Sequence, residues 1–480
     1  MTVDRLTALD SSFLWFERPG VPIHVGAVAT FEAGPLLDES GKLRLDDLRA
    51  RIGTRIGEMP RLRRRLAEVP FDLDRPHWVD DADFDVARHV GEVRLPSPGD
   101  DAALRRLAGR LQSEVLPRDR PLWDLRFVTG LTGDRVGLVE RVHHALVDGV
   151  SGVDLATVLL DLQPDTPAPP SPDPWAPAPV PPATTRIADA LRDRAGDPVR
   201  AARRIAHAAG HPTEVVRALR TVGRGLGAMV ADGIVAPRTS FNRAPEGGRL
   251  LAWVRVPLDQ VRGVAAAGDA TVNDVVLSAV AGGLRCVLLD RGERLPTDLV
   301  LKVLVPVSLR RDDEHGALGN RVGAIYAPLP VGLGDPDARL AAVAATTRRL
   351  KKRAEGAATG LVLDAANILP AAAARLVARA VDRQRVINLI VTNVPGPPVP
   401  LYAAGARMLD AFPVVPLGAN LAVGVAVLSY DGMLSITLTA DSVACPDVDA
   451  FAAGIEESFA RYGIGPTDPA RNTTAPALRS

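Results

Sequence analysis

Two adjacent histidines, His143 and His144, are followed by Asp148 and Gly149 in the pattern HHxxxDG. A histidine side chain titrates near neutral pH, so it can take a proton from a hydroxyl or thiol group. Asp148 lies four positions after His144, and two roles are open to it. It could contact the imidazole and fix its orientation, or it could pair with a distant arginine and hold the loop. The pattern therefore predicts proton-transfer chemistry centred on His144.

The residues around the motif predict a connection between a strand and a helix. Residues 136–142 are mostly apolar, as in a buried strand, and Ser151 with Asp154 is typical of a helix start. Gly149 can adopt backbone angles that are closed to other residues and so turn the chain sharply. Such connections often carry reactive side chains. A pair of buried histidines beside a turn is the alternative interpretation, and this context makes it the weaker one.

The segment HHALVDG resembles the active-site motif of CoA-dependent acyltransferases of the chloramphenicol-acetyltransferase type, a group that includes the condensation domains of peptide synthetases. Other segments resemble bacterial wax ester synthase/diacylglycerol acyltransferases in particular. They occur in that family's order, from about Leu6 to about Tyr462. These segments are Leu9–Trp15, Pro22–Gly26, Pro121–Trp123, Asn273–Leu277, Val305–Arg310 and Leu318–Asn320.

The resemblance implies an α/β fold with mixed sheets, in which two chloramphenicol-acetyltransferase-like domains hold the active site at their interface. It also implies transfer of a fatty acyl group from acyl-CoA, the co-substrate, to the hydroxyl of diacylglycerol or of a long-chain alcohol. The products would be triacylglycerol or a wax ester. His144 would be the general base in a ternary complex, with no metal, no cofactor and no acyl-enzyme. Two alternatives stay open: an acyl-CoA or ester hydrolase, and a non-catalytic acyl-CoA-binding protein.

Further candidate site residues lie in the same segments. His143 stands outside the His-x-x-x-Asp register and is a secondary catalytic candidate. Asn273, in the first turn of an expected helix, could donate its amide to a developing oxyanion or could serve that turn as a cap. Arg310 is the candidate partner of Asp148, because related acyltransferases hold the histidine loop with an Asp–Arg pair. Trp123 either lines the substrate site or packs at a turn.

The composition is that of a globular protein. The chain has 480 residues, 47% of them hydrophobic and 24% charged, and its formal net charge is zero. This length favours more than one domain, and the balanced charge gives no argument for nucleic-acid binding. Cys286 and Cys445 are too few for a disulfide framework and lack metal-ligand spacing, so we expect buried thiols in a reducing cytoplasm. Neither a signal peptide nor a membrane-spanning segment is expected.

Changes in composition divide the chain into five parts. We predict an N-terminal acyltransferase domain with the histidine motif over 1–163, a proline-rich linker over 164–183, a basic helical connector over 184–235, a C-terminal acyltransferase-like domain over 236–463 and a tail over 464–480. The dense prolines of the linker exclude helix interiors and sheets and favour an extended spacer.

Two basic segments each admit a packing role and a binding role. Between Arg186 and Arg224, nine arginines stand against four acidic residues, and apolar residues fall at helical spacing. These helices either pack on the protein or dock on an anionic lipid surface. The second role predicts a cytoplasmic protein that associates peripherally with a membrane or lipid droplet. The cluster from Pro60 to Arg65 is either a solvated face, which we favour, or a site for CoA phosphates.

Hydrophobic periodicity places the remaining elements. Helices are expected over 45–56, 102–116, 275–289, 337–355 and 447–462. Strands are expected over 21–32, 125–129, 250–256, 299–307, 320–329 and 387–394, and a hairpin turning at Asp431 and Gly432 joins strands over 420–428 and 434–440.

Overall fold

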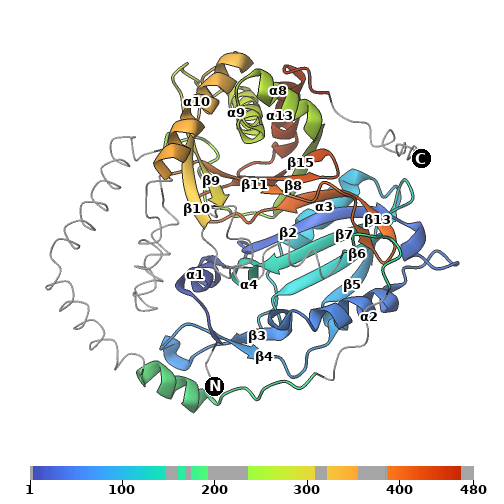
Figure 1. The fold of residues 1–480 in the computed structure, drawn as a ribbon. Helices are drawn as coiled ribbons and strands as arrows, with labels where there is room; N and C mark the ends of the chain where they lie inside the picture. The colour runs from blue at the N-terminus through green and yellow to red at the C-terminus, as the bar shows by residue number, and fades with distance from the viewer. Residues whose placement is uncertain are drawn as a thin grey trace.

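The fold is built on two six-stranded sheets, which lie one above the other in Figure 1. The computed structural model describes residues 4–147, 160–167, 175–192, 236–308, 322–354, 384 and 386–465. Helices cover the outer faces of the sheets, and both sheets mix parallel with antiparallel neighbours. The prediction of a mixed α/β fold is confirmed.

The first sheet contains the strand that leads into the histidine motif. Its order is β12-β13-β2-β7-β6-β5, and its neighbours pair antiparallel except β5 with β6. The motif strand β7 lies between two partners, so its backbone is hydrogen-bonded on both edges. The strands are β2 (His24–Glu32), β5 (Val90–Arg94), β6 (Trp123–Leu131), β7 (Arg135–His143), β12 (Tyr402–Ala403) and β13 (Ala406–Val414).

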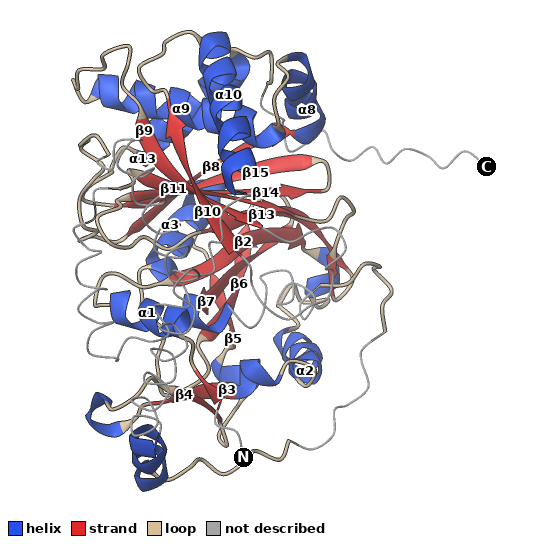
Figure 2. Ribbon diagram, turned by 60° about the vertical axis from the view of Figure 1, so that its left-hand side comes forward, coloured by secondary structure: helices blue, strands red, loops and turns tan. Residues whose placement is uncertain are grey.

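The second sheet is formed by the C-terminal half of the chain and has the order β10-β9-β11-β14-β15-β8. Strand β11 runs parallel to both of its neighbours, and the other pairs are antiparallel. Helices gather on one face of this sheet, toward the top of Figure 2. The strands are β8 (Arg249–Pro257), β9 (Leu301–Ser308), β10 (Val322–Leu329), β11 (Leu389–Pro395), β14 (Val423–Tyr430) and β15 (Met433–Asp441).

Strand β13 crosses from the second half of the chain into the first sheet. It pairs with β2, with Met408 opposite Phe31 and Val414 opposite Gly26. The predicted C-terminal domain over 236–463 therefore gives one strand pair, β12 and β13, to the first sheet. Periodicity could not reveal this crossing, because apolar alternation shows that a strand is buried without naming its partner.

A small third sheet and the helices complete the fold. The third sheet, of order β1-β4-β3, lies at the bottom of Figure 1 with the N-terminus. Residues 183–192 form a further helix. The remaining short strands and the α-helices are β1 (Asp4–Arg5), β3 (Arg64–Ala67), β4 (His77–Asp80), α1 (Ala8–Phe16), α2 (Leu45–Ile56), α3 (Asp101–Gln112), α4 (His144–Val147), α8 (Leu258–Ala267), α9 (Val272–Asp290), α10 (Pro336–Ala354) and α13 (Val448–Ala460).

Helix α3 joins the two sheets. It packs on one face of the first sheet and also rests against β8, and apolar residues from both sheets meet around it. Gly109 allows this close approach, because a Cβ atom there would lie 2.4 Å from the backbone oxygen of Arg249. On the same contact, the Arg249 backbone N–H donates to the Ser113 hydroxyl at 2.7 Å. The two halves are thus held together by both apolar packing and hydrogen bonds.

Helix α9 is the central helix of the second half. Its nineteen residues are apolar enough to cross a membrane by length and composition, the one such helix among the described residues, and 72% of its most apolar window is buried inside the fold. It packs against α8, α10 and α13 over the second sheet. Buried contacts of this extent are those of a core helix.

Candidate active site

The histidine pair lies where β7 ends and the short helix α4 begins. The His143 backbone N–H donates to the Leu122 carbonyl, and that of His144 donates to the Ile23 carbonyl, both at 2.9 Å. His143 is completely buried, whereas His144 remains partly exposed. The predicted placement of the pair on a strand-to-helix connection is confirmed as far as Val147, where the described part of the motif ends.

Both ring nitrogens of His143 face protein groups. Nδ1 accepts a hydrogen bond from the Ala145 backbone N–H at 3.0 Å. Nε2 lies 3.4 Å from Glu17 Oε1, a close polar contact. The buried ring therefore connects the end of β7 both to the first turn of α4 and to the residue that follows α1.

The carboxylate of Glu17 is the centre of a buried polar cluster. Its side chain is only 2% exposed, and Oε1 also lies 3.5 Å from His24 Nε2, while Oε2 accepts from Arg118 at 3.0 Å. Burial alone would raise the pKa of Glu17, but the contacts with His143, His24 and Arg118 hold that pKa well below its usual range. We call these four residues the Glu17 cluster. No sequence motif pointed to a role for Glu17.

Helix α1 contacts the histidine pair at two points. The Phe13 ring stacks on the His144 ring with centroids 3.9 Å apart and an interplanar angle of 26°. Glu17, four residues later on the same side of the helix, reaches His143. Figure 1 shows α1 and α4 next to each other at the edge of the first sheet. Phe13 belongs to the Leu9–Trp15 segment, which only its family resemblance had marked. The four-residue spacing between Phe13 and Glu17 is the sequence signal for a shared helix face.

Asn273 lies in the first turn of α9, where the sequence placed it. Thr271 caps this helix through a capping box with Asp274, and the Thr347 hydroxyl donates to the other oxygen of that aspartate at 2.6 Å. The Asn273 side-chain oxygen accepts from Asn393 Nδ2 at 3.4 Å. Its amide N–H₂ group makes no hydrogen bond to the described residues. The cap role therefore falls to Thr271, and the amide donor of Asn273 is left for another partner.

Trp123 is a packing residue. It is 3% exposed, its indole N–H donates to the Leu62 carbonyl at 2.8 Å, and its ring stacks on His89 with centroids 4.4 Å apart. It pairs with Val142 across β6 and β7, directly before the histidine pair. Of the two roles considered for Trp123, the geometry favours packing that stabilises the motif strand over contact with substrate.

Asp148, Gly149 and Arg310 lie outside the described residues, so their roles stay predictions. The chain after the motif is described again from Leu160. There the buried Asp161 forms ion pairs with Arg51, at 2.7 Å, and with Arg55, both on α2, and its backbone bridges to Tyr402. These contacts hold the chain in place at Asp161, on the C-terminal side of the motif.

The arginines of the Pro60–Arg65 cluster are engaged within the protein. Arg64 bonds to Asp4 and Asp80, at 2.6 and 3.1 Å, and Arg65 pairs with Asp81 at 3.7 Å. Arg63 lies over the Trp175 ring, 3.8 Å from its centroid. These protein partners, rather than the solvent of the expected solvated face, surround the arginines, and they argue against a site for CoA phosphates.

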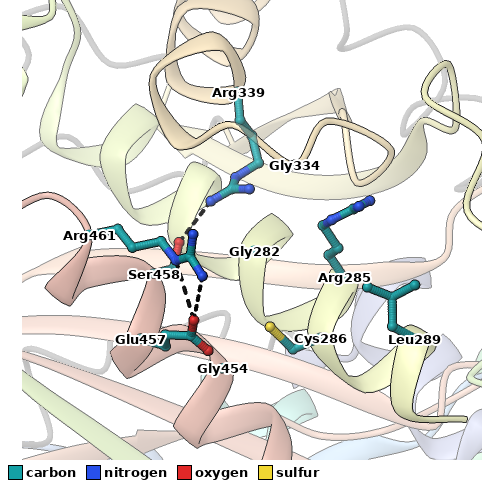
Figure 3. A pocket seen from close by; sticks show the side chains of 10 residues that line it. All are labelled: Gly282, Arg285, Cys286, Leu289, Gly334, Arg339, Gly454, Glu457, Ser458 and Arg461. Atoms are coloured by element: carbon teal, nitrogen blue, oxygen red, sulfur yellow. Dashed lines mark hydrogen bonds and ion pairs between the residues drawn. The ribbon is translucent and has the colours of Figure 1, made fainter.

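A separate cavity of about 160 Å³ lies between α9, α10 and α13 (Figure 3). Arg339 donates to the Ser458 hydroxyl at 3.0 Å, and Arg461 pairs with Glu457 at 2.6 Å. Cys286 also lines this cavity, and both it and Cys445 are free thiols. His143 and His144, the described residues of the motif pattern, do not line the cavity, so we do not place acyl transfer there. Among the described residues, no group of three or more His, Cys, Asp and Glu side chains is arranged to hold a metal ion.

Comparison with known families matches nearly the whole chain. Residues 6–276 match the model of the wax ester synthase/diacylglycerol acyltransferase catalytic domain, and residues 318–462 match the C-terminal domain of the same family. A protein of Mycobacterium tuberculosis named as a probable diacylglycerol O-acyltransferase, tgs1, is 33% identical over 472 residues, which cover 96% of each chain. A second from that organism, tgs2, is 31% identical over 470 residues, covering 95% of this chain and 98% of its own.

Solved structures share the fold. The wax ester synthase/diacylglycerol acyltransferase from Marinobacter aquaeolei is similar with a TM-score of 0.66 at 24% identity, covering 96% of this chain and all of its own. The starter condensation domain of rhizomide synthetase, solved in complex with C8-CoA, is similar with a TM-score of 0.55 at 14% identity, covering 96% of this chain and 94% of its own. At these identities the likeness shows the fold.

Proposed function

We propose that this chain, which belongs to the wax ester synthase/diacylglycerol acyltransferase family, transfers a fatty acyl group from acyl-CoA to the hydroxyl of diacylglycerol or of a long-chain alcohol, with His144 as general base. The relatives' names supply the acceptor class. The condensation domain crystallised with C8-CoA supports a CoA thioester as the donor.

One observation supports His144 as the base. It is the partly exposed member of the pair, whereas His143 is fully buried with Nδ1 occupied by the Ala145 N–H. Phe13 stacks on the His144 ring, and the Ile23 carbonyl holds its backbone. A base must meet substrate in a fixed orientation, and of the two histidines only His144 combines exposure with such support.

The chemistry that these residues support is direct transfer. The acceptor oxygen attacks the thioester carbonyl carbon while His144 takes the hydroxyl proton, and the carbonyl oxygen becomes an oxyanion. The Asn273 amide is the proposed donor to that oxyanion. When the C–S bond breaks, the CoA thiolate leaves and takes the proton back from His144. The ester forms, CoA is released as the thiol, and the histidine returns to its neutral state.

The assay that tests this function supplies purified protein with labelled palmitoyl-CoA and either dioleoylglycerol or hexadecanol. We expect labelled triacylglycerol or wax ester, one molecule of free CoA for each ester formed, and no turnover without an acceptor. Release of labelled fatty acid at the same rate with and without acceptor would instead identify a hydrolase. Binding of palmitoyl-CoA without any product would identify a non-catalytic binding protein.

We also propose that the protein meets these lipids by peripheral association with an anionic membrane or lipid-droplet surface. The support is the composition of the basic connector, 184–235, most of which lies outside the described residues. Each arginine near such a surface contributes about 1 kcal/mol, which salt screens. Changing Arg200, Arg203 and Arg204 to Gln should weaken sedimentation with anionic vesicles while turnover of a short-chain, water-soluble alcohol survives. Vesicle binding that ignores both salt and these changes would rule the connector out.

A further inference from the structure

The buried carboxylate of Glu17, the residue directly after α1, contacts His143 of the histidine pair. Among the elements it touches, only β7 leads directly into the motif, and it reaches that strand through His143. A buried carboxylate is costly unless its neighbours compensate its charge. Arg118 and the Ile23 backbone N–H, at 3.0 and 3.4 Å, supply part of that compensation. The position is thus an energetically demanding one that the fold nevertheless maintains.

The contacts of His143 determine which of its nitrogens carries the proton. The Ala145 N–H is a donor, so the Nδ1 atom that it contacts must be an acceptor without a proton. A neutral imidazole has one N–H, which is then on Nε2. Nε2 faces Glu17, and an ionised carboxylate can only accept. The two ends of the ring therefore require the same tautomer.

This tautomer matters because His144 lies between His143 and Ala145, the two residues that the hydrogen bond of the His143 ring joins. The ring belongs to the last residue of β7, and the N–H that it accepts belongs to the second residue of α4. If Nδ1 were protonated, this bond would be lost and two donors would face each other at 3.0 Å. The chain would then leave the strand differently, and the His144 ring would turn with it.

We propose that Glu17 is a positioning residue for acyl transfer: it holds His143 in the Nε2-protonated form, and His143 in turn fixes the turn that presents His144. This role rests on the proposed function of His144 as general base. Glu17 does not touch substrate. It contacts His143, which precedes the proposed base in the sequence. Its role resembles that of the aspartate that orients the histidine of a serine-protease triad.

The first test is Glu17→Gln, which keeps the shape of the side chain and removes its charge. We expect kcat to fall about 10- to 100-fold, less than the ~10⁴-fold cost of the wrong tautomer in a serine-protease triad, because Glu17 acts through a second histidine. KM for palmitoyl-CoA should stay close to that of the wild type. Unchanged kcat in a folded variant would overturn the proposal.

A double-mutant cycle shows whether Glu17 acts through His143. Asparagine at position 143 keeps an acceptor for the Ala145 N–H but is too short to reach Glu17. Glu17→Gln should therefore lower kcat no further in the His143→Asn background, and equal losses in both backgrounds would overturn the proposal. His24→Asn is the matched control, because His24 is also buried against Glu17 but lies on β2. If His24→Asn and Glu17→Gln give the same loss in kcat, the carboxylate acts through β2 and the proposal is wrong.

A measurement without turnover separates this proposal from the proposed function. In protein labelled with ¹⁵N-histidine, the nitrogen shifts of His143, assigned with the His143→Asn variant, distinguish the two neutral tautomers. We expect the Nε2-protonated ring at pH 7 in the wild type. A Nδ1-protonated or doubly protonated ring would overturn the role of Glu17, even if His144→Ala abolishes turnover. An active His144→Ala variant would overturn the proposed base while leaving the tautomer result intact.

Discussion

The two segments that carry candidate catalytic side chains are anchored in different ways. At the end of β7, the turn that presents His144 is held from α1 by the stacked Phe13 ring and by Glu17. At the start of α9, the turn that presents Asn273 is held mainly by its own capping box, in which the Thr271 N–H donates to Asp274 at 2.8 Å. The first anchor is tertiary and uses a buried charge, whereas the second is mostly local in sequence.

This difference has consequences for function and stability. A local cap stabilises its helix whether or not the rest of the site is assembled. The anchor at β7 exists only once α1 has packed beside α4, so the geometry of His144 depends on the tertiary fold. We therefore expect substitutions in the β7 anchor to affect turnover and substitutions in the α9 cap to affect mainly stability.

His144→Ala should cause the largest effect and defines the β7 side of the comparison. A positioned general base contributes about 10²–10⁴-fold to rate, and we expect a loss of kcat in that range with palmitoyl-CoA and dioleoylglycerol. The melting temperature should change little, because His144 is partly exposed. Activity within a few-fold of the wild type would show that another group is the base.

Asn273→Ala should cause the next largest effect. Loss of one oxyanion donor costs about 10²–10³-fold in kcat, and KM for acyl-CoA should be nearly unchanged. The Asn273 side-chain oxygen accepts a hydrogen bond only from Asn393 Nδ2 among the described residues, at 3.4 Å, so a small loss of stability is expected. A variant that unfolds at lower temperature yet turns over normally would show that Asn273 is a structural residue.

The local features of the fold could be predicted from the sequence. Helix α2 spans the expected residues, 45–56, and Thr271, a residue type typical of N-caps, caps α9. The hairpin between β14 and β15 turns at Asp431 and Gly432, which have φ angles of 44° and 79°. Each of these signals, an apolar period, a capping residue or a turn pair, is contained within a few neighbouring residues.

The features that required the structure are contacts between distant segments. Glu17 is an ordinary acid after an apolar stretch, and only the packing of α1 brings it to His143. Trp123 could line a site or pack, and its stacking on His89 favours packing. The partner of a strand such as β13 is likewise set by tertiary structure. The histidine pattern was visible in the sequence, but the contact of Glu17 with His143 was not.

Thr271→Ala tests the local side of the comparison. Replacing an N-cap threonine with alanine costs about 1 kcal/mol of stability, so urea unfolding should begin at lower concentration. Turnover of the folded protein should remain near that of the wild type, because the Asn273 amide is not part of the capping box. If Thr271→Ala loses as much kcat as Asn273→Ala, the cap also positions the amide and the two anchors are more alike than proposed.

Glu140 sharpens the comparison, because it is an acidic residue of β7 that lacks the partners of Glu17. Its carboxyl group makes no hydrogen bond or ion pair to the described residues, and burial raises its pKa to about 7. Between its ordinary value of 4.5 and about 7, the folded protein keeps a proton that the unfolded chain releases. Stability should therefore fall as pH rises through this window and change no further, from this group, above it.

Glu140→Gln should remove that dependence. At pH 8 the variant should be more stable than the wild type, and the difference should vanish near pH 4.5. Glu17→Gln should behave in the opposite way, since the pKa of Glu17 is depressed and its ionised form stabilises the fold at neutral pH. That variant should be less stable than the wild type at pH 7, with a difference that shrinks on acidification below the ordinary pKa. Urea unfolding of both variants between about pH 3 and pH 8 measures the two trends, and parallel trends would show that the contacts of Glu17 do not distinguish it from an acid that lacks such partners.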